Sequence, residues 1–313
     1  MPRDKQFIAG LEDALIVRVR TELGTAFNTR NDEIELTALR TQGTVTDSPV
    51  VLLARLQGYR WVVHISPRSA PDVIEEEQRK ASEAKAALGE TAGSVVLLAT
   101  HQGRLDGLSY SVTAFHQPIS QSGIELPWKP SLRAAILEWL RTSVSVTLSE
   151  NICRGDIADS VASLRDIADS SSFLRLAAEV AYDRCKSDEF SPRKVLMHGD
   201  LWSGNLLKCR NQTYPFYIID WRGSRKTGYP IFDLVRMAQS LKIPHGRVCL
   251  ELFNHARLLK CELQDARTYL VAALGSLAAN LDQFPTDRFI ALAESALVFH
   301  DSALQADGHG ALL

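Results

Sequence analysis

The stretch between residues 195 and 221 limits what this chain can fold into more than any other part of the sequence. A short apolar run leads into His198 and Asp200, and Asn205 follows five residues after Asp200. A second apolar run ends on Asp220. Short apolar runs bounded by turn residues are typical of buried strands. The pattern therefore predicts strand ends that bring three polar side chains into one site.

These polar groups suit phosphoryl transfer, a reaction that depends mostly on positioning and charge. Asp200 is the candidate catalytic carboxylate, which orients the attacking hydroxyl. Asn205 and Asp220 are the candidate ligands of Mg2+, since amide and carboxylate oxygens suit that ion. His198 is placed in the same catalytic loop, where bracing by hydrogen bonds is favoured over proton transfer. The alternative is that Asp200 and Asn205 form only turn hydrogen bonds.

The H-G-D-x-x-x-x-N spacing at 198–205, with I-D-W at 219–221, resembles the catalytic core of the aminoglycoside phosphotransferase and choline kinase group, which are relatives of protein kinases. The run 228–234 resembles the G-x-P-x-x-D-L segment of that group. The first loop is also similar to that of fructosamine kinases. The resemblance is clear over residues 195–234 and implies a protein-kinase-like fold with ATP and Mg2+ as cofactors.

The order of the expected elements favours an α+β fold with two lobes. We predict an N-lobe at 1–117, with an antiparallel sheet and one packed helix, and a mainly helical C-lobe at 118–313. The N-lobe is expected to contain helices at 7–23 and 72–88 and strands at 34–39, 49–56, 60–65, 93–100 and 108–115. The C-lobe is expected to contain helices at 132–148, 152–169, 173–188, 232–241, 246–263, 264–281 and 286–306.

The resemblance also implies a nucleotide site in the N-lobe. Gly43 belongs to the hairpin loop that would cover the phosphates, although this loop contains no G-x-G-x-x-G. In the resembling families, a helix of the N-lobe supplies a glutamate that pairs with a lysine on a neighbouring strand. Glu77 is the first candidate for this glutamate, and Glu83 is the second. The alternative for Glu77 is a solvated face near a helix N-terminus. Phe115 begins the crossing between the lobes, where backbone groups recognise adenine.

His64 marks a departure from the family pattern. The related families carry a lysine that reaches the phosphates at this strand position. An imidazole is shorter and carries less positive charge at neutral pH. Arg68, just beyond the strand, is the nearest candidate for a replacement cation. A strand histidine bonded to a neighbour is the alternative for His64.

Three basic residues and a tryptophan are candidates for binding the acceptor. Arg222, Arg225 and Lys226 follow Asp220 closely, and guanidinium groups bind carboxylates and phosphates well. They favour an anionic acceptor, with a solvated basic loop as the alternative. Trp202 would stack on a sugar or pack against the protein.

Composition excludes several classes of protein. The 313 residues carry a net charge of −2 and are 45% hydrophobic, which is typical of a soluble globular protein and not of a nucleic-acid-binding one. The longest uncharged helical stretch, 269–281, is too short to span a bilayer and is expected to be a buried helix. Five scattered cysteines indicate a reducing, cytoplasmic location.

The sequence therefore predicts an ATP- and Mg2+-dependent phosphotransferase. Its acceptor would be a hydroxyl of a small molecule or glycan, with a sugar or glycolipid-type acceptor favoured. The alternative is a pseudokinase-type binding or scaffold module with the kinase-like fold. A protein kinase is disfavoured, because no A-P-E segment follows Asp220.

Overall fold

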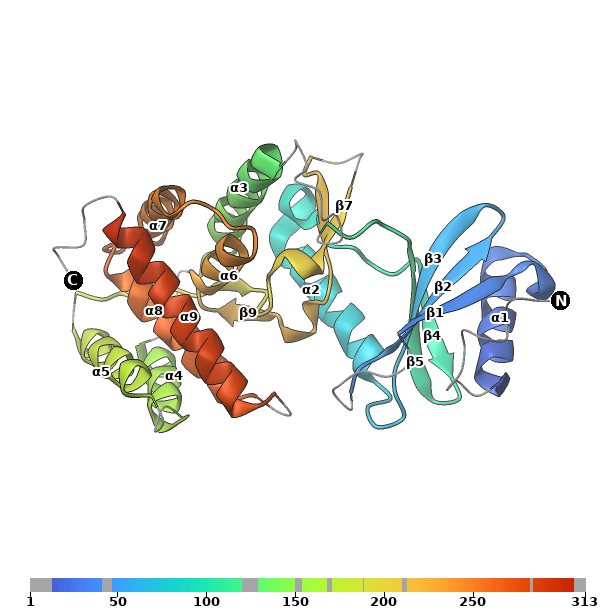
Figure 1. Cartoon of the computed structure of the whole chain (residues 1–313), viewed down its shortest axis with the longest axis horizontal. Helices are drawn as coiled ribbons and strands as arrows, with labels where there is room; N and C mark the ends of the chain where they lie inside the picture. Colours follow the sequence, from blue (N-terminus) through green and yellow to red (C-terminus); the bar gives the residue numbers. More distant parts are fainter. Residues whose placement is uncertain are drawn as a thin grey trace. The chain divides into compact units, whose positions relative to one another are not determined.

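The computed structural model in Figure 1 describes residues 13–40, 47–119, 129–149, 154–167, 171–187, 189–209, 213–281 and 284–306. The chain divides into two compact units. Unit 1 consists of Met1–Ser82, Val96–Gln117 and Ile219–Arg222, and unit 2 of Glu83–Val95, Pro118–Ile218 and Gly223–Leu313. Asp220 therefore belongs to unit 1, although it comes late in the sequence.

Unit 1 is built on an antiparallel five-stranded sheet with the order β1-β2-β3-β5-β4. The strands are β1 (Glu35–Arg40), β2 (Val50–Leu56), β3 (Tyr59–Ile65), β4 (His101–Leu105) and β5 (Leu108–Ala114). Two hairpins have two-residue turns with positive φ, at Gln57-Gly58 and Asp106-Gly107. Such turns match the right-handed twist of the flanking strands.

One face of this sheet forms the core with helix α1 (Asp13–Phe27), which Figure 1 shows in dark blue. A short 3-10 helix, η2 (Asn31–Glu33), leads from α1 into β1. The buried cluster contains Val19, Leu23, Leu36, Leu52, Ala54, Leu56, Val63, Ile65, Tyr110 and Val112. Side chains alternate along each strand, so His64 and Ser111 belong to the opposite face.

The strand predicted at 93–100 is wrong. The strand that pairs with β5 is β4, at His101–Leu105, directly before the Asp106-Gly107 turn. The apolar residues Val95 and Val96 are buried, but in a segment outside the sheet. Gly103 lies opposite Tyr110, and a Cβ on it would meet the tyrosine ring at 3.0 Å. Burial without strand pairing explains the misleading apolar run, and close contact with an aromatic ring explains the glycine in β4.

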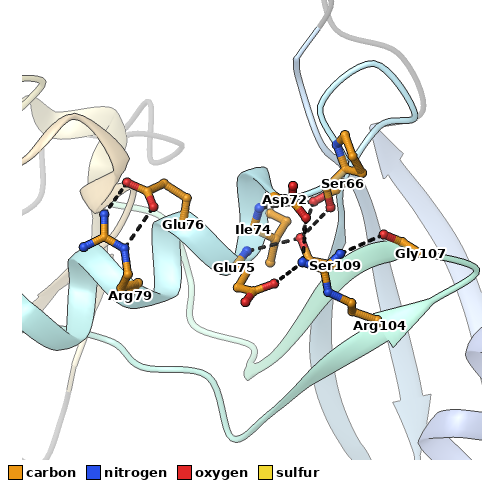
Figure 2. Close-up of polar contacts among 10 residues, drawn as sticks. Ser66, Asp72, Ile74, Glu75, Glu76, Arg79, Arg104, Gly107 and Ser109 are labelled. Atoms are coloured by element: carbon orange, nitrogen blue, oxygen red, sulfur yellow. Dashed lines mark hydrogen bonds and ion pairs between the residues drawn. The ribbon is translucent and has the colours of Figure 1, made fainter.

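Helix α2 (Val73–Gly93) begins beside the sheet of unit 1, where two serine hydroxyls accept hydrogen bonds from its first turn (Figure 2). The N–H of Ile74 donates to Ser66 Oγ at 3.1 Å, and the N–H of Glu75 donates to Ser109 Oγ at 3.2 Å. The two hydroxyls are 2.6 Å apart, and Ser109 also donates to the carbonyl of Pro71 at 2.9 Å. Free N–H groups at a helix start need acceptors, and here the sheet supplies them.

Arg104 of β4 adds charge to the same helix start. Its guanidinium donates to the carboxylates of Asp72 and Glu75 and, at 3.1 Å, to the carbonyl of Gly107 (Figure 2). Further along α2, Arg79 pairs with Glu76. Residues of α2 up to Ser82 belong to unit 1, and the remainder belongs to unit 2. The sheet and the first half of α2 thus form one hydrogen-bonded assembly.

Unit 2 is mainly helical. Its helices are α3 (Lys129–Thr147), α4 (Arg154–Ile167), α5 (Ser172–Lys186), α6 (Phe232–Ser240), α7 (His245–Leu259), α8 (Asp265–Ala278) and α9 (Thr286–Gln305). Two antiparallel strand pairs complete it, β6 (Val195–Met197) with β9 (Arg225–Gly228) and β7 (Leu206–Lys208) with β8 (Phe216–Ile218). The predicted α+β class, with an antiparallel N-terminal sheet and a helical C-terminal part, is confirmed.

Helix α8 is buried along almost its whole length, as predicted for the apolar stretch at 269–281. Gly275 allows it to approach α4 closely, since a Cβ there would overlap the carbonyl of Ser160. Among the described helices, none is long and apolar enough to cross a lipid bilayer.

Candidate active site

The candidate catalytic loop of unit 2 follows β6 and is tied to helix α6 by one carboxylate. The N–H of His198 donates to Asp233 Oδ2 at 2.6 Å, and the N–H of Gly199 donates to Asp233 Oδ1 at 3.1 Å. Burial raises the pKa of Asp233, while the neighbouring imidazole of His198 and these two backbone hydrogen bonds act in the opposite direction. Asp233 thus fixes the loop through both of its oxygens.

The backbone on both sides of this tie is unusual. Gly199 has a φ of 85°, and a Cβ on it would lie 3.0 Å from the carbonyl oxygen of Gly223. Ile231, just before α6, has a φ of 81°. A β-branched residue rarely adopts that conformation, and such strain collects at functional sites.

His198 and Asp200 lie next to each other in the loop. The imidazole of His198 is buried, and its Nδ1 accepts a hydrogen bond from the N–H of Asp200 at 3.3 Å. The side chain of Asp200 is 54% exposed. The histidine therefore takes part in the internal bonding of the loop, while the carboxylate of Asp200 is open to solvent.

The side chain of Asn205 has a defined orientation. Its Nδ2 donates to the carbonyl oxygen of Asp200 at 2.8 Å and to Asp200 Oδ2 at 3.2 Å. A carbonyl oxygen can only accept, so the amide must turn its NH2 group toward Asp200. Its Oδ1 is then directed away from Asp200, where it can serve as an acceptor or a metal ligand. Asn205 itself belongs to a short 3-10 helix, η4 (Ser203–Asn205), and is buried.

Arg236 was not singled out from the sequence, yet it neighbours the candidate catalytic carboxylate. It comes one helical turn after Asp233 on α6, and its guanidinium lies 4.0 Å from Asp200 Oδ1. Its side chain is 23% exposed. The spacing of three residues from Asp233 was the available signal, because residues three apart share a helix face.

Trp202 is exposed, and its ring lies on the backbone of Gly204, where a Cβ would meet the indole at 2.3 Å. The next residue, Ser203, donates its N–H to Ser240 Oγ at 3.0 Å. Trp202 therefore has a supported ring with an accessible surface. Trp221, in contrast, is 1% exposed and packs inside the protein.

The three basic candidates have different partners. Arg222 belongs to unit 1 and pairs with Asp47 at 2.5 Å. Arg225 donates to the Ser276 hydroxyl and, at 3.2 Å, to its carbonyl, whereas Lys226 lies 3.5 Å from Glu83. Glu83, the second candidate for the helix carboxylate, thus pairs with a lysine of unit 2.

In unit 1, the negative charge of Asp220 acts on Glu77. Asp220 is exposed, has a φ of 65° and is followed by a 3-10 helix, η5 (Trp221–Gly223). Burial, together with the negative charge of Asp220, raises the pKa of Glu77 to about 8. The positive charges of Arg222 and Arg40 oppose this rise. Glu77 therefore carries a proton at neutral pH.

His64 is uncharged at neutral pH. Burial, reinforced by the positive charge of Arg40, lowers the pKa of His64 to about 4. The strand position where the sequence pattern led us to look for a lysine is thus neutral. Arg40 was not identified from the sequence as a neighbour of His64, because their proximity depends on strand pairing.

Phe115 follows β5 in unit 1. Its N–H donates to the carbonyl of Arg60 at 2.9 Å, and the Arg60 guanidinium lies 4.2 Å from the centre of its ring. Gly43 lies outside the described residues. Across the described part of the chain, no three or more His, Cys, Asp or Glu side chains gather into a metal-binding group.

Comparisons with known proteins agree on one family and fold. The profile of the phosphotransferase enzyme family matches residues 35–270. A thermostable mutant of aminoglycoside phosphotransferase APH(4)-Ia, in a ternary complex with AMP-PNP and hygromycin B, is 14% identical, with a TM-score of 0.58 over 92% of this chain and 98% of that one. A further structure of aminoglycoside phosphotransferase APH(4)-Ia is 17% identical, with a TM-score of 0.54 over 92% of this chain and 97% of that one.

A putative aminoglycoside phosphotransferase from Ralstonia eutropha JMP134 is 15% identical, with a TM-score of 0.52 over 90% of this chain and 96% of that one. A comparison with curated protein sequences gave no match. At these identities the similar structures establish a shared fold.

Proposed function

We propose that this chain, which belongs to the phosphotransferase enzyme family, transfers the terminal phosphoryl group of ATP to a hydroxyl of a small molecule. The observation that carries the proposal is the arrangement of the catalytic loop. Asp200 presents an exposed carboxylate, and its neighbour Asn205 is held in a single orientation. ADP and AMP-PNP in complexes of the similar structures motivate ATP as the donor.

In the proposed reaction, the acceptor oxygen forms a bond to the terminal phosphorus, and the bond from that phosphorus to the bridging oxygen of ADP breaks. Asp200 accepts the proton of the acceptor hydroxyl at its carboxylate and orients the oxygen. Asp233 supports this role indirectly, because it holds the backbone of His198 and Gly199. His198 is proposed to stabilise the loop, because its Nδ1 accepts a hydrogen bond from the N–H of Asp200.

Mg2+ is the proposed metal, with Asn205 and Asp220 as its ligands. When bound, the ion would neutralise charge on the phosphates. The chemistry of the residues fits, since Asn205 directs Oδ1 away from Asp200 and Asp220 has an exposed carboxylate. Mg2+ usually takes one or two protein carboxylates and completes its shell with water and phosphate oxygens. Few protein ligands are therefore needed.

The nucleotide would bind through unit 1. His64, Glu77 and Phe115 are the proposed contacts there, together with Gly43 of the hairpin loop. The neutral states of His64 and Glu77 support a nucleotide site in which these two residues act by hydrogen bonding and not as an ion pair. Two uncharged groups that can hydrogen-bond replace the ion pair of a lysine and a glutamate.

The acceptor is proposed to be a sugar or glycolipid-type molecule with an anionic group. The supported and exposed ring of Trp202 would stack on a sugar face. Arg222, Arg225 and Lys226 are the proposed contacts for the anionic group. Lys226 is the most accessible of the three, with a side chain that is 58% exposed.

The test is a transfer assay with the purified full-length chain, ATP labelled on its terminal phosphate, Mg2+ and acceptors of three kinds. These are neutral sugars, sugars with a carboxylate or phosphate, and aminoglycosides. Label transfer to an anionic sugar supports the whole proposal. Transfer to aminoglycosides alone contradicts the acceptor class but leaves the reaction type in place.

A second candidate is a nucleotide-binding module that does not turn over. The specific observation in its favour is the neutral His64 at the strand position of the usual lysine. Mg2+-dependent ATP binding without transfer to any acceptor, and without slow hydrolysis of ATP, would favour this candidate.

A further inference from the structure

The pairing of the first three strands brings Arg40 into a row with His64. Arg40 pairs with Val51 of β2, and Val51 pairs with His64 of β3. Directly paired residues of neighbouring antiparallel strands point to the same face of a sheet. Arg40 and His64 therefore share a face, with Val51 of β2 between them, and it is the face opposite the core with α1.

A bulge in β1 is responsible for this placement. The register passes from Ala38 opposite Leu52 to Arg40 opposite Val51, so that Leu39 has no partner and is 54% exposed. Leu36 and Ala38 pack on the α1 face. With regular alternation Arg40 would follow them to that face, because side chains two apart in a strand point the same way. The extra residue turns Arg40 toward His64 instead.

The guanidinium of Arg40 is positioned but not neutralised. Its Nε donates to the carbonyl of Pro49 at 3.2 Å, and the side chain is exposed. It makes no ion pair with any carboxylate of the described residues. Arg222, the other arginine whose charge acts on Glu77, is paired with Asp47. Arg40 is thus held at one nitrogen and can still donate from its two terminal nitrogens.

We propose that Arg40 is the cation that binds the phosphate groups of the nucleotide, in place of the lysine that β3 lacks. The inference rests on the proposed function. A guanidinium forms paired hydrogen bonds with phosphate oxygens and remains charged at every accessible pH. The strand register places Arg40 on the same face as His64, and its positive charge lowers the pKa of that residue of the proposed nucleotide site. The bulge at Leu39 then places the positive charge of Arg40 on the face of the sheet that carries His64.

The experiment measures the affinities of the full-length protein for ATP and for adenosine, in the presence of Mg2+, by titration calorimetry. Arg40→Ala is expected to weaken ATP binding at least tenfold and to leave adenosine binding unchanged, because adenosine has no phosphate. Arg40→Lys should retain part of the affinity. His64→Lys in the Arg40→Ala background should recover part of it.

Arg55→Ala is the matched control. Arg55 is an exposed arginine on the same face of β2, four residues beyond Val51, and its loss removes the same charge from the same sheet. Arg68→Ala tests the cation suggested by the sequence. The inference is overturned if Arg40→Ala binds ATP as the wild type does. It is also overturned if Arg55→Ala or Arg68→Ala causes the larger loss, or if ATP and adenosine lose affinity equally.

A wild-type protein that binds no ATP would overturn the proposed function and the inference together. If the wild type binds ATP and Arg40→Ala binds it equally well, only the inference is overturned.

Discussion

The carboxylate of Asp233 accepts a hydrogen bond from the backbone N–H of His198 at 2.6 Å, across 35 residues of sequence. With the second bond from Gly199, the start of helix α6 fixes the loop that carries Asp200. The position of the candidate catalytic group therefore depends on a carboxylate from a different element, helix α6.

Asp233→Asn should test this dependence. An amide offers one acceptor oxygen, so one of the two N–H groups would face an NH2 group and lose its partner. We expect a loss of about 1–3 kcal/mol in the free energy of unfolding, which is the usual cost of an unsatisfied buried donor. The turnover number should fall at least tenfold. Denaturant unfolding and the transfer assay measure the two effects.

Asp287→Asn is the control for helix charge. Asp287 lies in the first turn of α9 and is exposed. It should change stability by well under about 1 kcal/mol. Equal effects of the two substitutions would show that Asp233 acts only through the helix dipole.

Asp200→Asn and Asp220→Asn should separate turnover from binding. A group that orients the hydroxyl matters chiefly in the transition state, whereas a metal ligand also holds the nucleotide. Asp200→Asn should lower the turnover number by about 100-fold or more with little change in ATP affinity. Asp220→Asn should weaken Mg2+-dependent ATP binding as well. Wild-type turnover by Asp200→Asn would remove Asp200 from its proposed role.

His64 predicts a dependence of stability on pH. Its pKa in the folded protein is about 4, below the ordinary value of 6.5, so the unfolded chain binds the proton first. The stabilisation is complete above pH 6.5 and is lost as the pH falls through about 4. The difference between these values, at about 1.4 kcal/mol per pH unit, sets an upper limit of about 3 kcal/mol.

The measurement is the free energy of unfolding of the wild type and of His64→Gln between pH 7.5 and 4. The wild type should lose stability relative to His64→Gln as the pH falls, because glutamine does not titrate. The positive charge of Arg40 lowers the pKa of His64, so Arg40→Ala should reduce this relative loss. Parallel curves across the range would contradict the assignment.

Two serines of β5 should respond in opposite ways to removal of their hydroxyls. Ser109 is buried and bonded to Glu75 and Pro71, so Ser109→Ala should destabilise by about 1–3 kcal/mol. Ser111 is also buried, but its Oγ has no hydrogen-bond partner within the described structure. Ser111→Ala should be neutral or stabilising, since it removes an unsatisfied polar group. Thermal unfolding of both variants decides the matter.

Charge reversal at Lys226 tests the proposed acceptor class. Lys226 is chosen because its replacement should disturb the fold least. Arg225 is bonded to Ser276, so its replacement would also disturb α8. For an anionic acceptor, Lys226→Glu should raise the Michaelis constant several-fold and leave that of ATP unchanged. Glu83→Lys is a useful counterpart, since Glu83 is the partner of Lys226. A higher constant for cationic acceptors after Lys226→Glu would contradict the proposed class.

Local patterns were sufficient for most of the helices and for the strand and turn that carry Asp200 and Asn205. The apolar run before His198 and the spacing of Asp200 and Asn205 involve neighbours in sequence, and the structure describes β6 and η4 at these positions. The helix expected at 286–306 is α9, at Thr286–Gln305. A helix is held by bonds between residues four apart, so its signal is contained in a short window.

Tertiary structure decided the rest, because it depends on pairing between distant segments. The apolar run at 93–100 has the composition of a strand, but the sheet edge is formed by His101–Leu105. The tie between His198 and Asp233 and the approach of Arg236 to Asp200 required α6 to pack beside the loop. Arg40 shares a face of the sheet with His64 only because the register of β1 on β2 slips by one residue at Leu39. In a strand with a side-chain period of two, one extra residue changes the face, and no local pattern records it.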